Sequence, residues 1–128
     1  MGPSIDHLAL AARDARASAQ LLADVLGVAA PAPDGPDGDM YNVHLDGADV
    51  LFAEPAPGVD PVTHHVAFRV DRAAFGAAVA HLTARGIAYG NDPEHPDNGE
   101  TSDPLGSPGR LYFLDPDGHL FELTVGPD

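Results

Sequence analysis

The sequence contains no cysteine and no tryptophan, and all six of its basic residues are arginine. Without cysteine, disulfides and thiolate metal sites are excluded, so any metal ion would have to be held by His, Asp or Glu. The sequence also lacks an apolar run long enough to cross a bilayer, and its beginning has no basic segment of the kind found in secretory signals. We therefore expect a soluble, cytoplasmic protein.

Positive charge is scarce as well. The formal net charge is -14, which would repel a nucleic-acid backbone, so neither nucleic acid nor a membrane is expected as a partner. The acidity is compatible with a cationic ligand, although it also serves solubility. With 128 residues, 44% of them hydrophobic, the chain is long enough to bury the core of one folded domain.

One pattern occurs twice in the chain. Segments 6–11 (DHLALA) and 64–69 (HHVAFR) alternate apolar and polar residues, as half-buried strands do. Each is followed by an aspartate at the place of a helix N-cap, Asp14 or Asp71, and then by an alanine-rich helical segment. Internal repeats of this size predict a two-module fold with pseudo-twofold symmetry.

The remainder of each copy predicts strands and tight turns. The helices are expected to end at Gly27 and Gly86, and a further strand is expected near 28–29 and near 87–89. Each copy then closes with a hairpin around an Asp-Gly pair. The sequence thus predicts an α+β fold of two βαβββ modules, 1–57 and 62–128, within a single domain 1–128.

Three polar side chains are expected on the faces of the strands that point away from the helices. Because side chains alternate along a strand, His7, His65 and Glu122 all project to that side. Glu122 stands in an otherwise apolar strand, where a buried carboxylate without a partner would be costly. Two imidazoles and a carboxylate suit a divalent metal ion and leave coordination positions open for substrate. We predict that these three residues are metal ligands.

Three segments resemble the vicinal oxygen chelate superfamily, which includes glyoxalase I, fosfomycin-resistance enzymes, extradiol dioxygenases and bleomycin-resistance proteins. They are IDHLAL (5–10), THHVAF (63–68) and YFLDPDGHLFEL (112–123). The resemblance implies two βαβββ modules whose curled mixed sheets surround a metal-binding groove. It also implies that the first-strand His of each module and the last-strand Glu of the second hold the metal, at positions that match His7, His65 and Glu122.

The chain departs from part of the superfamily at one ligand position. Glyoxalase-type members use a fourth ligand on the last strand of module one, and Leu51 occupies the matching position here. The three-ligand set is more similar to that of the fosfomycin-resistance enzymes or the extradiol dioxygenases. Tyr112 matches a substrate-contacting tyrosine of the fosfomycin-resistance enzymes, so it is our candidate catalytic residue.

A polar segment between Gly90 and Gly109 is expected to form a long loop, and loops of this length are often lids or substrate-binding loops. The residues expected to contact substrate there are Asn98, Thr101 and Ser102. His95 is a spare candidate for acid-base chemistry. His119 is expected at the surface.

Three functions are compatible with these features. The first is a metal-dependent enzyme in which a divalent ion (Mn, Fe, Ni, Zn or Co) chelates a small oxygenated substrate and acts as a Lewis acid. The second is a protein of the bleomycin-resistance type that sequesters an antibiotic or another small molecule. The third is an Fe(II) extradiol-type dioxygenase. The resemblance further implies a homodimer, in which the site either lies within one chain or is shared between the two chains.

Overall fold

The structure is a computed structural model that describes residues 2–126, and its chain divides into two compact units. Unit one holds the chain up to Asp24 together with Val28–Thr63, and unit two holds Val25–Gly27 together with the chain from His64 onward. Both units combine one helix with an open mixed sheet. The predicted α+β architecture of two βαβββ-like modules is confirmed.

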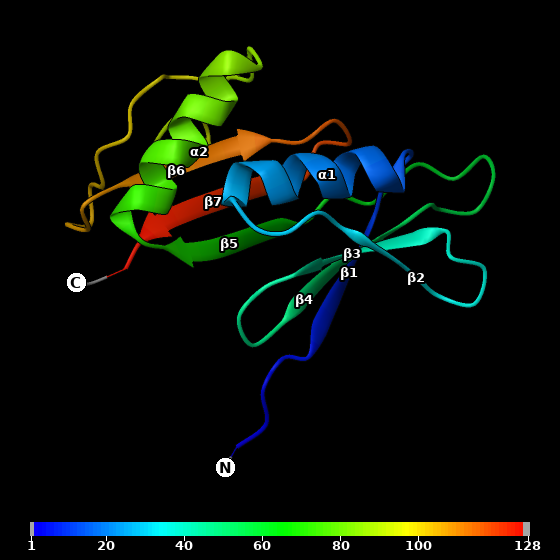
Figure 1. Cartoon of the computed structure of the whole chain (residues 1–128). Coiled ribbons are helices and arrows are strands. Elements are labelled where there is room, and N and C mark those ends of the chain that lie inside the picture. Colours follow the sequence, from blue (N-terminus) through cyan, green and yellow to red (C-terminus); the bar gives the residue numbers. More distant parts are fainter. Residues whose placement is uncertain (1, 127–128) are drawn as a thin grey trace. The chain divides into compact units, whose positions relative to one another are not determined.

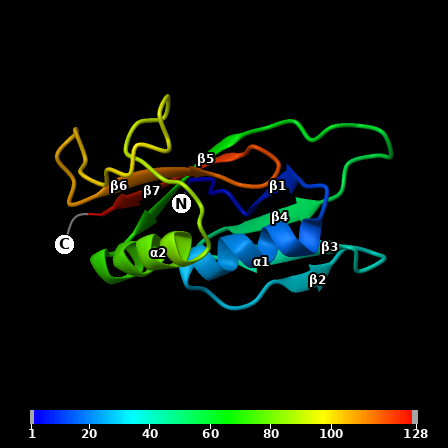
Figure 2. The ribbon, with the colours of Figure 1, turned by 90° about the horizontal axis from the view of Figure 1, so that it is seen from above.

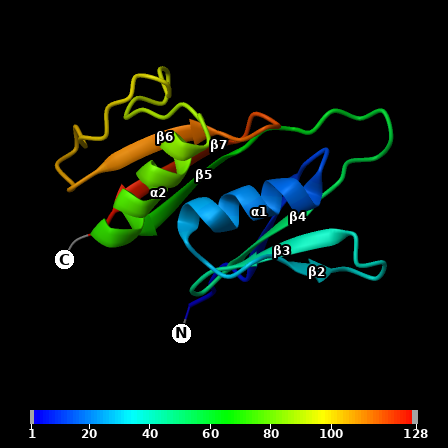
Figure 3. The same cartoon turned by 45° about the horizontal axis from the view of Figure 1, so that its top comes forward.

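Unit one carries a four-stranded sheet in the described part of the chain. Its elements are β1 (His7–Ala11), α1 (Ala15–Leu26), β2 (Ala32–Asp34), β3 (Met40–His44) and β4 (Asp49–Ala53). The strands are ordered β1-β4-β3-β2, with β1 parallel to β4 and the other pairs antiparallel. Helix α1 runs along one face of this sheet (Figures 1 and 3).

Unit two repeats this arrangement with three strands among the described residues. Its elements are β5 (His65–Val70), α2 (Arg72–Ala84), β6 (Arg110–Leu114) and β7 (Leu120–Val125). The central strand β7 runs parallel to β5 and antiparallel to β6, and α2 packs against it (Figure 1). Neither helix found in residues 2–126 is long and apolar enough to cross a membrane.

The predicted helix caps are present at both helices. The carboxylate of Asp14 accepts a hydrogen bond from the amide of Ala17 at 3.0 Å, and that of Asp71 accepts one from Ala74 at 2.7 Å. Each bond satisfies an amide that has no partner within its helix. At the other end, Gly27 and Gly86 have φ values of 70° and 67°, the left-handed conformation that glycine tolerates best.

The strands predicted directly after the two helices are not where the sequence pattern put them. Residues 28–29 and 87–89 are not in strands, because the amides of Val28 and Ile87 bond back to helix carbonyls. These bonds, 3.0 Å and 2.9 Å long, close the helix ends in the manner of a Schellman motif. In unit one the strand begins later, as β2. In unit two it is reduced to an isolated bridge between Gly90 and Tyr112.

The turn between β6 and β7 corrects a second expectation. His119 was expected at the surface, but it is 0% exposed. The carboxylate of Asp115 accepts from the amide of His119 at 2.8 Å, and this contact folds the turn inward. Nδ1 of His119 then accepts a hydrogen bond from the amide of His64 at 3.0 Å, just before β5. A polar ring with a backbone partner can be buried at little cost.

Candidate functional site

The face of the second sheet that points away from α2 gathers polar side chains from all three of its strands. Strand pairing places Tyr112 on β6 directly opposite Glu122 on β7, and Arg110 opposite Thr124. On β5, Ala67 is the partner of Glu122, and His65 lies two residues earlier on the same face.

Glu122 is the centre of this cluster. Its side chain is only 9% exposed, and its Oε1 lies 2.9 Å from Nε2 of His65. The other oxygen, Oε2, accepts hydrogen bonds from Nη1 of Arg110 and from Oγ1 of Thr124. Glu122 therefore has a charged partner within the protein, because Arg110 supplies the opposite charge. The burial of Glu122 does not by itself require a metal ion.

Arg110 in turn binds a second carboxylate. Its Nε donates to Oδ1 of Asp103 at 2.9 Å, and its Nη2 donates to Oδ2 at 3.3 Å. This two-pronged contact is the geometry that a guanidinium prefers. It lowers the pKa of Asp103 well below the usual carboxyl range and raises that of Arg110, so both groups are charged at neutral pH.

Tyr112 lies beside His65, with ring centroids 5.9 Å apart. The tyrosine is buried, and burial raises the pKa of its hydroxyl although Arg110 acts in the opposite direction. The hydroxyl is therefore protonated at neutral pH and able to donate a hydrogen bond. This is the property that the predicted role of Tyr112 requires.

His7, the ligand predicted from the first repeat, stands on β1 in unit one. It is exposed, and its Nδ1 lies 2.8 Å from a carboxylate oxygen of Asp6. This contact raises the pKa of His7, and the nearby Asp49 and Asp34 add to the effect. With Nδ1 engaged by Asp6, the Nε2 atom is the one left for a ligand, as in many carboxylate–histidine–metal arrangements.

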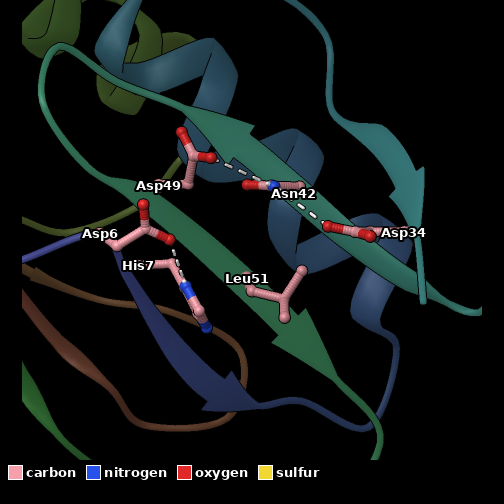
Figure 4. Close-up of a pocket in the computed structure, with 6 residues that line it drawn as sticks. All are labelled: Asp6, His7, Asp34, Asn42, Asp49 and Leu51. Atoms are coloured by element: carbon pink, nitrogen blue, oxygen red, sulfur yellow. Dashed lines mark hydrogen bonds and ion pairs between the residues drawn. The ribbon is translucent and has the colours of Figure 1, made fainter.

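A cavity of about 210 Å³ lies next to His7 within unit one (Figure 4). It is lined by Asp6, His7, Asp34, Asn42, Asp49 and Leu51. The amide nitrogen of Asn42 donates to Asp34 at 3.2 Å and to Asp49 at 3.4 Å, which joins the two carboxylates across β3. Leu51, which the resemblance matches to the fourth-ligand position of glyoxalase-type members, supplies an apolar side chain to the cavity wall.

The predicted loop between Gly90 and Gly109 is held by its own hydrogen bonds and lies on the β6 side of unit two (Figure 2). Oδ1 of Asn98 accepts from the amides of Asn91 and Glu100, and its Nδ2 donates to Asn91. The carbonyls of Thr101 and Ser102 accept from Arg110 and Asn91. The substrate-binding role of Asn98, Thr101 and Ser102 stays a prediction. His95 is exposed and lies 3.2 Å from Asp92.

Of the predicted ligands, the fold brings His65 and Glu122 together within unit two, whereas His7 belongs to unit one. Among residues 2–126, no three His, Asp or Glu side chains are grouped closely enough to hold a metal ion. The three-ligand set spans both units and stays a prediction.

Sequence reasoning missed several residues that contact the predicted ones. Arg110 and Asp103 join Glu122, while Asp6 and Asp49 surround His7. The alternation rule already carried a signal for Arg110, because it lies two residues before Tyr112 on the same strand and so shares its face. Asp103 had no such signal, because it lies in an irregular loop.

Comparison with known proteins identifies the family. Residues 4–123 match the model of the Glyoxalase/Bleomycin resistance protein/Dioxygenase superfamily. A comparison with curated proteins gives no match. Among solved structures, oxidase ChaP-H1 is 31% identical, with a TM-score of 0.88 and 98% of each chain covered. Oxidase ChaP-H2 is 30% identical, with a TM-score of 0.86 and with 99% of this chain and 96% of that chain covered.

A third structure shares the fold at lower identity. Lactoylglutathione lyase from Agrobacterium tumefaciens is 20% identical, with a TM-score of 0.68 and with 98% of this chain and 95% of that chain covered. The match of the family model over nearly the whole chain agrees with the two mixed sheets and the repeated module. The chain belongs to the Glyoxalase/Bleomycin resistance protein/Dioxygenase superfamily, that is, to the vicinal oxygen chelate superfamily.

Proposed function

We propose that this chain is a metal-dependent enzyme whose divalent ion is held by His7, His65 and Glu122. The observation that carries the proposal is the 2.9 Å separation between Nε2 of His65 and Oε1 of Glu122 on the open sheet face. Two ligand atoms about 2.1 Å from one ion, at right angles to each other, lie roughly 3 Å apart. The pair therefore has the spacing of neighbouring ligands.

The chemistry of the two donor atoms also fits a metal ion. An imidazole nitrogen and a carboxylate oxygen are both ligand atoms for divalent metal ions, and here Nε2 of His65 and Oε1 of Glu122 face each other. The contacts of Arg110 are to Oε2 and leave Oε1 directed at His65. On the other unit, the Asp6 carboxylate orients His7 with Nε2 free. These features support the assignment of all three residues.

For the reaction type, we propose oxidation of a small substrate that carries vicinal oxygen atoms. The similarity to two proteins named as oxidases, at 31% and 30% identity, favours this class over the other reactions of the superfamily. Two His and one carboxylate form the ligand set of many iron(II) oxygenases. When bound, iron(II) would supply a Lewis acid and electrons for dioxygen, whereas a redox-inert ion would supply the Lewis acid alone.

The protein's own groups would position the substrate. The neutral hydroxyl of Tyr112 would donate a hydrogen bond to a substrate oxygen, and its buried ring would exclude water from one side. Asn98, Thr101 and Ser102 would act from the adjoining loop. A homodimer would place further groups around the site, as often happens in this superfamily.

The acidic cavity of unit one favours a second candidate, a protein that sequesters a cationic small molecule. Asp6, Asp34 and Asp49 line this cavity of about 210 Å³. Three carboxylates would attract an amine-bearing ligand such as a cationic antibiotic. This function would require neither the metal ion nor the Tyr112 hydroxyl.

Metal content measured on the purified protein and its Glu122→Gln variant tests the main proposal. We expect about one divalent ion per chain in the wild type and a loss of at least tenfold in affinity in the variant. Glu100→Gln, an exposed glutamate of the loop, is the matched control and should keep the metal. Oxygen uptake by the anaerobically iron-loaded protein with catechols then separates oxidation from Lewis-acid chemistry. A wild type that binds no divalent ion would contradict the metal centre and favour the sequestering function.

A further inference from the structure

The two oxygen atoms of Glu122 lie in different surroundings. Oε1 faces Nε2 of His65, whereas Oε2 accepts from the Arg110 guanidinium and, at 3.1 Å, from the hydroxyl of Thr124. Thr124 is two residues further along the same strand and Arg110 is its partner on β6, so both donors approach from the same side. The carboxylate is thereby fixed in one orientation.

Arg110 is itself held in place from the loop. Its Nε and Nη2 bind the two oxygens of Asp103, a side chain that is only 1% exposed. The same two oxygens accept the backbone amides of Leu105 at 2.9 Å and Ser107 at 3.1 Å. The orientation of Glu122 is therefore fixed by a chain of contacts that begins in the loop.

The charges along this chain of contacts do not cancel. Asp103 and Glu122 each carry one negative charge and Arg110 carries one positive charge, which leaves a net charge of about -1. The guanidinium is shared between the two carboxylates and contacts Glu122 at Oε2, whereas Oε1 faces His65. Arg110 therefore orients Glu122 without neutralising the site.

We propose that Asp103 and Arg110 are positioning residues that, together with Thr124, withhold Oε2 of Glu122 and present Oε1 as the single donor atom of this residue. The inference rests on the metal centre proposed above. A carboxylate that binds through one oxygen uses one coordination position instead of two. An additional position would then stay open for a substrate that chelates through two oxygens.

Four variants test this inference. Arg110→Gln and Thr124→Val remove the donors to Oε2, and Arg110→Lys keeps the charge but loses the forked contact with Asp103. Arg69→Gln is the matched control, because Arg69 lies on the same sheet face, opposite Thr124 on β5, and its loss changes the net charge equally. Zinc titration by calorimetry should show dissociation constants that rise about 10- to 100-fold in Arg110→Gln and Arg110→Lys and stay within about twofold in Arg69→Gln.

Crystal structures of the same variants supply a readout that does not depend on activity. With zinc bound, the wild type and Arg69→Gln should bind through Oε1 alone, and Arg110→Gln should bring both oxygens within about 2.5 Å of the ion. Coordination by both oxygens in the wild type, or by one oxygen in every variant, would overturn the inference. If Arg110→Gln does not fold, the coordination of the ion by Glu122 is compared between the wild type and Thr124→Val instead.

Metal-free crystals distinguish failure of this inference from failure of the proposed function. If the wild type binds no zinc, the metal centre is wrong, yet the orientation of Glu122 can still be compared between metal-free wild type and Arg110→Gln. If the carboxylate of Glu122 turns away from His65 in the variant, the positioning role of Arg110 is supported. If the carboxylate stays in place, Arg110 does not position it and the inference is contradicted.

Discussion

Nη1 of Arg110 donates a hydrogen bond to Oε2 of Glu122, twelve residues further along the chain. The side chains of both residues are largely buried, with 16% and 9% of their surfaces exposed. The contact explains how an otherwise apolar strand carries a glutamate. It also makes the stability of unit two depend on a charged network rather than on apolar packing alone.

Removal of Arg110 from this network should lower the stability of the protein. We expect Arg110→Ala to lower the free energy of unfolding by about 3 kcal/mol, because it leaves the carboxylates of Asp103 and Glu122 buried without their cation. Urea denaturation in the presence of a chelator measures this quantity. The double variant Arg110→Ala/Glu122→Ala should lose less than the sum of the two single variants, and strict additivity would show that the pair does not interact.

The ion pair between Asp103 and Arg110 predicts a dependence of stability on pH. The pKa of Asp103 is lowered in the folded protein, so its contribution is present above the ordinary carboxyl pKa of about 4 and is lost as the pH falls below it. The difference in unfolding free energy between wild type and Asp103→Asn should therefore be largest near pH 7 and shrink towards pH 3. Urea titrations at four or five pH values measure it, and a constant difference would contradict the role of the charge.

The buried imidazole of His119 should contribute to the stability of the fold through both its volume and its hydrogen bond. We expect His119→Ala to cost about 3 kcal/mol, because it leaves a cavity in the core. His119→Phe fills the space but leaves the amide of His64 without its acceptor, so it should cost about 1–3 kcal/mol. Thermal denaturation compares the two variants. A phenylalanine variant as stable as the wild type would show that the hydrogen bond contributes nothing.

Two glycines of unit two should respond in opposite directions to alanine. A Cβ at Gly90 would lie 2.4 Å from Oδ1 and 2.7 Å from the backbone nitrogen of Asn98, so Gly90→Ala must displace the loop and should destabilise the protein. Gly76 lies inside α2 with nothing within 4 Å of an added Cβ, so Gly76→Ala should stabilise the helix by about 1 kcal/mol. Melting temperatures test both signs. A neutral Gly90→Ala would mean that the loop can shift freely.

Features decided by neighbouring residues were predictable from the sequence alone. The caps at Asp14 and Asp71, the glycine helix ends and the module repeat follow from local hydrogen bonding and backbone conformation. Alternation along strands likewise predicted that His65 and Glu122 share a face, because the period of a strand is fixed by its pleat.

Tertiary structure alone decided which partners those residues meet. The choice of Arg110 and Asp103 as companions of Glu122 depends on strand register and on an irregular loop, and no local pattern encodes either. His119 became buried because the turn closed over it and the His64 amide, 55 residues away, satisfied its ring. The strands expected after the helices failed for a different, local reason, since helix-closing bonds took the amides that a sheet would have used. Residue type and period determine which side chains share a face, whereas long-range contacts determine which of them bind one another.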